Sequence, residues 1–402
     1  TVFDVMPQYP NKVLVTINRM PQFTYRYRDL YWLDLETKET TKIAEVPTID
    51  NEQFFGWMVD HEGNARGFST SHDAGRDRKP NSAKDGLYTY FYMMDSKTGN
   101  YKKMQSCKHQ EPCLYPLDFD LDNRHVFAVG QAVLADGTLD PDWEYTDTNA
   151  LWLYDSETGK VVEKVFHDKK YDFSNPRQGY SDGYVLIDRV NKKLLGLSYY
   201  ADKRKYVYYD QGYANLRESV KATFPGKIVS IVPNSDFTKV IINTSSEKDP
   251  GTGYFYDVSK GKIEFIASYA PWLQDYDLGS TYPFEFTARD GVELMGYLTL
   301  PPGYKKGEKI PFILHPHGGP NAKDRFGFNP EVQIYATRGY GVLQINYRGS
   351  VGFGLKEMKL ANKQWSLAMH DDLLDGLFWA NDQGYVNICL LYTSDAADDL
   401  LC

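Results

Sequence analysis

The chain contains 402 residues, with 45 Lys and Arg against 54 Asp and Glu, so its formal net charge is −9 at pH 7. Because no basic cluster is longer than Lys203–Lys205, this acidic balance excludes nucleic acid as an expected partner. No run of 18 apolar residues occurs, so we expect neither a membrane-spanning helix nor a membrane partner.

The first two thirds of the chain repeat an aromatic-rich strand that ends in an aspartate. The repeated aspartates are separated by 61, 60, 55 and 47 residues; they are Asp34, Asp95, Asp155, Asp210 in a weaker copy, and Asp257. A period near 50 residues with several strands per unit is typical of propeller blades. We therefore predict a partial β-propeller over residues 1–272, with about five four-stranded blades, the first of them incomplete.

Hairpins with polar turns lie between these aspartates, at residues 57–64, 119–126 and 232–240. Asp, Asn and Gly supply the turn geometry, and strand-forming residues flank them. We expect the repeated aspartates to accept hydrogen bonds from backbone N–H groups two residues further on. Their predicted role is turn formation, not catalysis.

Two segments of this region imitate functional motifs. Gly179–Gly183 fits G-x-S-x-G, but a strand follows Ser181 where a nucleophile elbow requires a helix, so we interpret it as a turn. Asp118–Asn123 resembles the start of a calcium loop, but Val129 stands where a bidentate Glu is needed. We therefore interpret this segment as a propeller turn and not as a calcium site.

The chain has four cysteines, Cys107, Cys113, Cys389 and Cys402, too few for a disulfide framework. Cys107 and Cys113 can pair across a local turn or remain free thiols. The sequence leaves both alternatives open.

The repeat stops at Pro271, and a second pattern begins. We predict antiparallel strands over 283–287 and 292–300, then buried strands over 310–314 and 341–346. A helix is expected from Asn329–Pro330. A later helix is expected to bury an apolar face and to carry structural acids in its first turn; the face is Leu373, Leu374, Leu377 and Phe378, and the acids are Asp371 and Asp372.

The segment His315–Pro320 reads His-Pro-His-Gly-Gly-Pro and follows the predicted strand 310–314. Two glycines at the end of a strand let main-chain N–H groups point at an anion, as an oxyanion hole requires. Gly319 and Gly318 are therefore the candidate oxyanion-hole residues. A plain Gly-Pro turn is the alternative, and we expect His315 and His317 to orient or pack the loop.

A second glycine-rich loop, Asn346–Gly354, follows the next predicted strand. With the HGGP loop and the acid-bearing helix after it, this order resembles the prolyl oligopeptidase family of serine peptidases, especially its acylaminoacyl-peptidase-like branch. The resemblance is close from Tyr282 to Val386 and looser before. It implies an α/β-hydrolase domain after the propeller, in which Tyr347 and Arg348 brace the neighbouring loop.

The predicted hydrolase domain covers residues 273–388. Family members continue with a strand ending in G-x-S-x-G and with a later Asp and His, whereas residues 389–402 hold none of these motifs and resemble an artefactual tail. Family propellers also have more blades. We therefore expect a fragment truncated at both ends, with an open ring and without the nucleophilic Ser, the acid or the base.

The resemblance implies that the parent protein hydrolyses short peptides or acylaminoacyl groups through an acyl-enzyme and needs no metal or organic cofactor. We expect this chain by itself to be inactive. A carboxylesterase on the same scaffold is one alternative. A non-catalytic propeller that binds other proteins is another. Peptide specificity, compartment and oligomeric state are not readable from the sequence.

Overall fold

The computed structural model describes residues 1–18, 28–49, 51–73, 87–175, 182–308 and 310–393. These residues form two compact units, one ending at Tyr199 and the other beginning at Tyr200. Ser181 of the G-x-S-x-G segment and residues 394–402 of the predicted tail lie outside the described residues.

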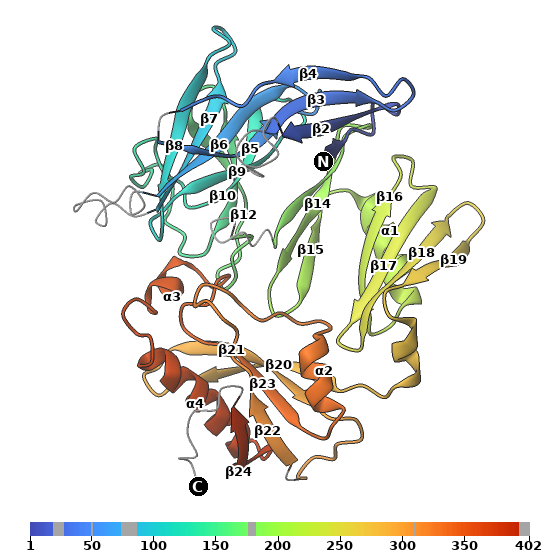
Figure 1. Cartoon of the computed structure of the whole chain (residues 1–402), viewed down its shortest axis with the longest axis vertical. Helices are drawn as coiled ribbons and strands as arrows, with labels where there is room; N and C mark the ends of the chain where they lie inside the picture. The colour runs from blue at the N-terminus through green and yellow to red at the C-terminus, as the bar shows by residue number, and fades with distance from the viewer. Residues whose placement is uncertain (19–27, 50, 74–86, 176–181, 309, 394–402) are drawn as a thin grey trace. The chain divides into compact units, whose positions relative to one another are not determined.

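Among the described residues, the first unit is built from antiparallel sheets whose strands follow one another in chain order (Figure 1). The first sheet consists of β1 (Val2–Val5), β2 (Lys12–Asn18), β3 (Arg28–Asp34) and β4 (Thr40–Ala44). The second consists of β5 (Gln53–Val59), β6 (Ala65–Asp73), β7 (Leu87–Met94) and β8 (Tyr101–Lys108). The third consists of β9 (Leu114–Phe119), β10 (His125–Gly130), β11 (Ala150–Asp155) and β12 (Lys160–Phe166). Four strands in meander order are the arrangement of a propeller blade.

The next sheet contains β13 (Tyr184–Asp188), β14 (Lys193–Tyr200) and β15 (Arg204–Tyr208), and the division between the units falls at the end of β14. Helix α1 (Gln211–Thr223) follows β15. A further four-stranded sheet consists of β16 (Ile228–Pro233), β17 (Lys239–Ser246), β18 (Asp249–Asp257) and β19 (Lys262–Ser268).

The prediction that the first blade is incomplete is wrong, because β1 to β4 form a complete four-stranded sheet. The shorter sheet among the described residues is the fourth, in which helix α1 follows the third strand. The weak repeat at Asp210 explains this difference. Its carboxylate accepts a hydrogen bond from the Tyr213 N–H and so caps α1, instead of turning the chain into a fourth strand.

Three of the repeated aspartates, Asp34, Asp95 and Asp155, form turns as predicted. Asp95 accepts hydrogen bonds from the backbone N–H groups of Lys97 and Thr98 at 2.9 and 3.0 Å. The same two-bond pattern recurs at Asp34 and Asp155. These hydrogen bonds favour the ionised form, and they hold the pKa of Asp95 below its usual value.

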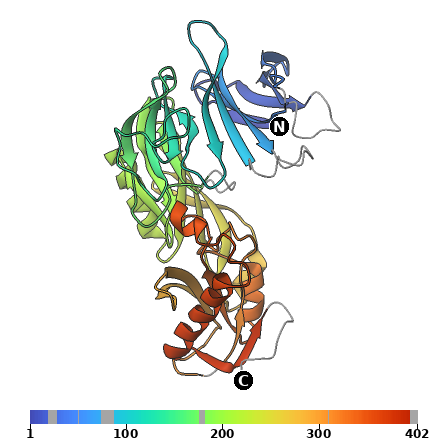
Figure 2. The ribbon, with the colours of Figure 1, turned by 90° about the vertical axis from the view of Figure 1, so that its left-hand side faces the viewer.

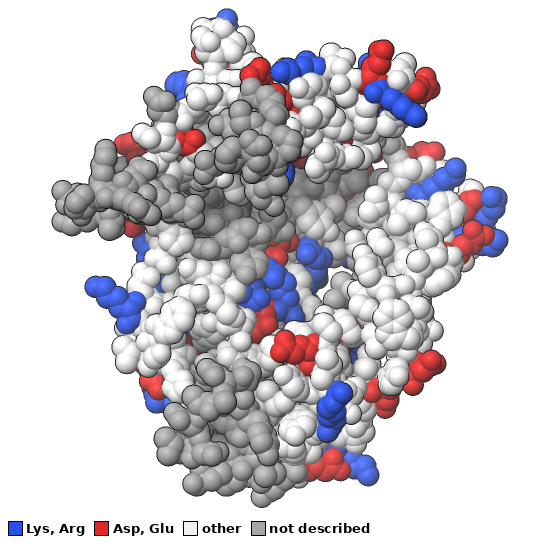
Figure 3. All heavy atoms as spheres, viewed as in Figure 1, with Lys and Arg blue, Asp and Glu red and all other residues white. Residues whose placement is uncertain are grey.

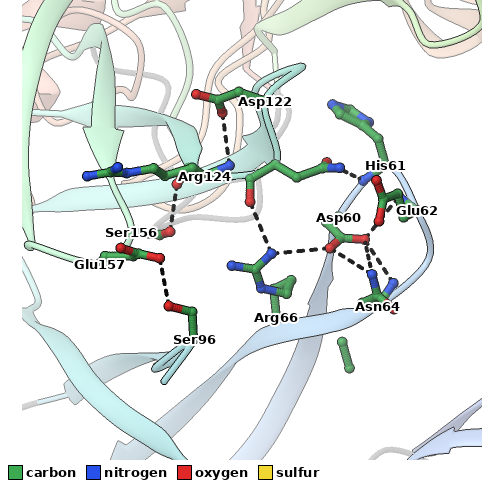
Figure 4. A network of polar contacts seen from close by, with 12 residues as sticks. Asp60, His61, Glu62, Asn64, Arg66, Ser96, Asp122, Arg124, Ser156 and Glu157 are labelled. Carbon is green, nitrogen blue, oxygen red and sulfur yellow. Dashed lines mark hydrogen bonds and ion pairs between the residues drawn. The ribbon is translucent and has the colours of Figure 1, made fainter. Parts of the chain in front are cut away.

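Polar turn residues also join neighbouring sheets of the first unit (Figure 4). The Asn123 side chain accepts a hydrogen bond from the His61 N–H at 2.9 Å, and its carbonyl accepts one from Arg66 at 3.1 Å. Ser96 donates to Glu157 at 2.8 Å. In the predicted calcium-loop imitation, Asp122 accepts from the Arg124 N–H, which agrees with a turn. Hydrogen bonds between turns thus hold adjacent blades in register.

Cys107 and Cys113, the pair that the sequence left open, form a disulfide with a Cα–Cα distance of 5.4 Å. Both residues are buried where β8 passes into β9. The bridge therefore closes the connection between the second and third sheets.

The 3-10 helix η3 (Pro271–Asp275) separates the last blade-like sheet from a mixed five-stranded sheet of order β20-β21-β23-β22-β24. Its strands are β20 (Ser280–Thr287), β21 (Glu293–Leu300), β22 (Ile310–Leu314), β23 (Gly341–Asn346) and β24 (Val386–Thr393). Strand β22 pairs in parallel with β23 and β24, and β24 lies at the sheet edge (Figure 2). Strand β24 continues past residue 388, while the domain limits themselves stay a prediction.

The helices of this part are α2 (Pro330–Ala336), α3 (Leu355–Lys359) and α4 (Ala368–Asp382). The connections from β22 to β23 and from β23 to β24 step in opposite directions along the sheet. Because such crossovers are right-handed, α2 and α4 cover opposite faces (Figure 1). The Asn329 side chain caps α2 by accepting from the Glu331 and Val332 N–H groups, as expected.

The predicted apolar face of α4 is partly wrong. Leu377 is fully buried, but Phe378 is 38% exposed. Asp372 and Gly376 occupy the sheet-facing stripe. Gly376 packs so closely that a Cβ there would lie 2.2 Å from Ile345 Cδ1. Two of the buried positions of this helix are thus set by the ion pair of Asp372 with Arg348 and by the close approach of Gly376 to Ile345. Hydrophobic periodicity detects neither.

Candidate functional site

The two-glycine loop leaves the carboxyl end of β22 at the predicted position. The His315 N–H donates to the Leu343 carbonyl at 2.8 Å, which anchors the start of the loop on β23. Gly318 and Gly319 are both exposed, so neither amide is sealed inside packing. Gly319 has φ +143°, and a Cβ there would lie 2.8 Å from the Asn321 nitrogen. The position therefore requires glycine, and an approaching anion can reach the loop.

The His317 side chain holds this loop against the loop that follows β23. Its ring stacks on Tyr347 with centroids 4.6 Å apart, and Tyr347 Oη donates to the His317 carbonyl at 2.8 Å. His317 Nδ1 donates to the Gly318 carbonyl at 2.8 Å, so Nε2 of the neutral ring is an acceptor, 3.0 Å from Ser350 Oγ. The Ser350 hydroxyl also lies 2.6 Å from the Tyr347 carbonyl. Burial lowers the pKa of His317. The ring is therefore a neutral support for the loop, in agreement with the orienting role expected from the sequence.

The loop after β23 is hydrogen-bonded to the glycine loop. Asn321 Nδ2 donates to the Gly349 carbonyl at 3.0 Å, and the Val351 N–H donates to the Ala322 carbonyl at 3.0 Å. The two glycine-rich segments recognised in the sequence thus form one bonded structure at the carboxyl ends of β22 and β23. Open α/β sheets place their ligand sites at such strand ends.

Arg348 braces this structure, as expected. Its guanidinium donates to both carboxyl oxygens of the buried Asp372, at 2.8 and 2.7 Å, and also contacts Asp290 at 2.7 Å. The hydrogen bonds that Arg348 donates to Asp372 raise the pKa of Arg348, and the hydrogen bond from Arg348 lowers the pKa of Asp290. Asp372 therefore ties the second loop to α4, the structural role that the sequence predicted for the acids of this helix.

Asp324 is a polar residue of the site that the sequence did not single out. Gln344 Nε2 donates to its Oδ1 at 2.7 Å, while Oδ2 is buried without a hydrogen-bond partner. Burial raises the pKa of Asp324 to about 6, although His315, Gln344 and Arg325 act in the opposite direction. No motif marks this position. Its only sequence signal is a charged residue in the short connection between the glycine loop and α2.

Within the described ranges, no group of three or more His, Cys, Asp and Glu side chains is placed to hold a metal ion. In the same part of the chain, no helix is long and apolar enough to cross a membrane. The printed sequence holds one G-x-S-x-G segment, Gly179–Gly183, which precedes the glycine loop in the chain. The oxyanion assignment of Gly318 and Gly319 stays a prediction.

The geometry is that of a propeller-plus-α/β-hydrolase protein, in which blade-like sheets precede a mixed sheet with a glycine loop at its strand ends. Comparison with solved structures gives the same fold class. A crystal structure of puromycin hydrolase aligns with a TM-score of 0.59 and 13% identity, covering 98% of this chain and 57% of the other. A puromycin-hydrolyzing peptidase from Mycobacterium tuberculosis aligns with a TM-score of 0.59 and 13% identity, covering 94% and 64%.

Sequence comparison is more specific. Residues 326–391 match the profile of the Prolyl oligopeptidase family. Dipeptidyl aminopeptidase BIII of Pseudoxanthomonas mexicana is 28% identical over 392 residues, 95% of this chain and 50% of that protein. Dipeptidyl peptidase family member 6 of Caenorhabditis elegans is 30% identical over 254 residues, 58% of this chain and 34% of that protein. The chain is therefore similar to members of the prolyl oligopeptidase family, and it spans half or less of the length of these two relatives.

Proposed function

We propose that the protein to which this chain belongs is a serine peptidase that hydrolyses short peptides or acylaminoacyl groups through an acyl-enzyme. The observation that carries the proposal is the exposed Gly318–Gly319 pair at the carboxyl end of a parallel strand. The family match and the peptidase names of the relatives support it. Because these relatives are named as dipeptidyl peptidases, we propose a peptide and not a simple ester as the substrate.

In the proposed mechanism, a serine outside the two glycine loops attacks the scissile carbonyl. The carbonyl oxygen becomes negative, and the Gly319 N–H, assisted by that of Gly318, donates to it. Loss of one such donor costs about 3 to 4 kcal/mol of transition-state stabilisation. His317, Tyr347 and Ser350 hold the loop so that these amides do not have to reorganise during the reaction.

We propose that this chain carries the oxyanion loop and supplies neither the nucleophile nor the acid nor the base of this mechanism. The one G-x-S-x-G segment precedes the loop, and no such segment lies in residues 389–402. We therefore propose that the 402-residue chain does not form an acyl-enzyme by itself.

A fluorophosphonate probe tests both statements, because it labels only an activated serine. We expect the full-length gene product to be labelled at one serine and the 402-residue chain to remain unlabelled. Labelling of the chain would show that the proposed absence of a nucleophile is wrong. A full-length product that is not labelled but still folds would favour the non-catalytic propeller.

Comparing a dipeptide p-nitroanilide with a p-nitrophenyl ester would separate a peptidase from a carboxylesterase.

A further inference from the structure

Asp324 fastens the end of the first glycine loop to strand β23 through its backbone and its side chain. Its N–H donates to Asn346 Oδ1 at 2.7 Å, and its carbonyl accepts from Asn346 Nδ2 at 3.2 Å. Its carboxylate accepts from Gln344 Nε2 at 2.7 Å. Gln344 and Asn346 are 4% and 2% exposed, and they share one face of β23 because they are two residues apart. The end of the loop is therefore fixed to a buried strand.

The start of the loop is fixed to the same strand. The His315 N–H donates to the carbonyl of Leu343, the residue that precedes Gln344, at 2.8 Å. Burial raises the pKa of Asp324 and His315 acts in the opposite direction, so the residues at the two ends of the loop lie close enough to interact. The glycine pair is thus carried by a loop that is held at both ends on neighbouring residues of β23.

A hydrogen-bonded turn connects Asp324 to Gly319, which it follows by five residues. The Ala322 N–H donates to the Pro320 carbonyl at 2.8 Å, and the Ala322 carbonyl accepts from the Val351 N–H at 3.0 Å. The connection is therefore a turn with internal bonds and not a free linker. We expect a shift of Asp324 to be passed on to the Gly319 amide.

The carboxylate of Asp324 costs stability. Acidic and basic side chains are spread over the face shown in Figure 3, where water solvates their charges. Asp324 Oδ2, by contrast, is buried and has no hydrogen-bond partner among the described residues. An ionised carboxyl in such a place is unfavourable. The side chain is therefore better explained by what its other oxygen holds in place than by a contribution to stability.

We propose that Asp324 is a positioning residue for the oxyanion loop, because its hydrogen bonds to β23 set the direction in which the Gly319 amide points. The proposal rests on the proposed function for the assignment of that amide to the oxyanion, and it adds the residue that keeps the amide in place. Asp324 acts through the turn and not by contact with the substrate. Since Gln344 Nε2 needs only an acceptor, an uncharged side chain with an oxygen in the same place also meets the requirement.

Hydrogen–deuterium exchange of the 402-residue chain tests the anchor without any measurement of activity. Asp324→Ala removes the acceptor for Gln344, whereas Asp324→Asn keeps an oxygen there. We expect Asp324→Ala to speed exchange about tenfold at the Ala322 and Val351 amides, read by mass spectrometry of the peptides that contain them. Asp324→Asn should leave both rates within about twofold. Unchanged exchange in Asp324→Ala would overturn the proposal.

Kinetics of the full-length gene product test the consequence for catalysis, with kcat calculated per enzyme that the fluorophosphonate labels at completion. We expect Asp324→Ala to lower kcat about 10-fold to 100-fold with little change in KM, since misplacing a group of the site by about 1 Å costs up to about 100-fold. Asp324→Asn should keep kcat within about threefold of the unaltered enzyme. A residue with a merely structural role would change the labelled fraction but not kcat per labelled enzyme.

Gln344→Met removes the same hydrogen bond from the side of β23, and it should lower kcat by a similar factor even if Asp324→Ala does not fold. Thr299→Val is the matched control, because it removes a buried hydrogen bond of 2.8 Å to Thr281 in the same sheet. Thr299 pairs with Val342, at the other end of β23 from the loop. It should lower stability and leave kcat within about twofold. An equal loss of kcat in Thr299→Val, or in Asp324→Asn, would overturn the proposal.

Failure here is distinguishable from failure of the proposed function. An unlabelled full-length product, combined with faster exchange in Asp324→Ala, removes the acyl-enzyme and leaves Asp324 as the anchor of the loop. A labelled product whose kcat is the same in Asp324→Ala as in the unaltered enzyme removes only the positioning role.

Discussion

The carboxyl group of Asp324 has one oxygen bonded by Gln344 and one buried without a partner. Its pKa in the folded chain is about 6, while an aspartate in an unfolded chain titrates near 3.9. The folded state therefore holds this proton more tightly than the unfolded state. Above pH 6 the buried charged carboxylate lowers the free energy of unfolding. This destabilisation disappears as the pH falls from about 6 to about 4, because the carboxyl group is then protonated in the folded state.

Asp324→Asn should accordingly raise the free energy of unfolding by about 2 kcal/mol at pH 7.5, because a neutral amide is less costly to bury. The gain should disappear near pH 4. Urea denaturation at both pH values measures it. Asp95→Asn is a control of opposite sign, because the turn hydrogen bonds lower the pKa of Asp95 and its carboxylate stabilises the folded state above the unfolded pKa. A gain in Asp324→Asn that does not change with pH would contradict the assignment.

At the scale of single elements, Arg348 and Arg289 offer a direct comparison. Both contact acids of α4, but Arg348 is 5% exposed and pairs with the fully buried Asp372. Arg289 lies at the surface and pairs with Asp371 and Asp375. Removing one partner of a buried pair leaves an uncompensated charge, whereas exposed pairs contribute little.

Arg348→Met should therefore lower the free energy of unfolding by about 3 to 5 kcal/mol. Arg289→Met should lower it by less than about 1 kcal/mol. Chemical denaturation of the two variants measures both losses in the free energy of unfolding. Equal effects would show that Arg348 does not hold the second glycine loop on α4.

The disulfide makes a separate prediction for the connection between β8 and β9. In the chain-entropy model, a bridge between residues this close in the chain lowers the entropy of the unfolded state and so raises the free energy of unfolding by about 2 kcal/mol. Cys107→Ser/Cys113→Ser should lower stability by that amount, and dithiothreitol should destabilise the unaltered chain to the same extent. Reductant that still destabilised the double variant would point to another cause.

Elements with local signals could be predicted from the sequence. The aspartate turns, the Asn329 cap and strands β22 and β23 depend on residues close together in the chain, and the structure places them as expected. The role of Asp210 as the N-cap of helix α1 could not be predicted, because an aspartate is equally suited to a turn and to a helix cap. The buried face of α4 was missed because Asp372 is neutralised by a residue of a distant loop.

At the scale of the whole molecule, the order of glycine-rich motifs predicted the family, and the profile match and relatives agree. Asp324 could not be found in the same way. Its raised pKa arises from burial in the folded chain, where Gln344 of β23 is its hydrogen-bond partner. A fold of this kind shows its motifs in sequence and its charge distribution only in three dimensions.

The most direct test of the central claim is the turnover number of Gly319→Ala in the full-length gene product, with a dipeptide p-nitroanilide as substrate. Alanine cannot keep φ +143° beside the Asn321 nitrogen, so the amide must turn away, whereas a Cβ at Gly318 meets nothing within 4 Å. We expect Gly319→Ala to lower kcat by about 100-fold to 1,000-fold with little change in KM, and Gly318→Ala to have a much smaller effect. A kcat for Gly319→Ala within about twofold of the unaltered enzyme would contradict the account.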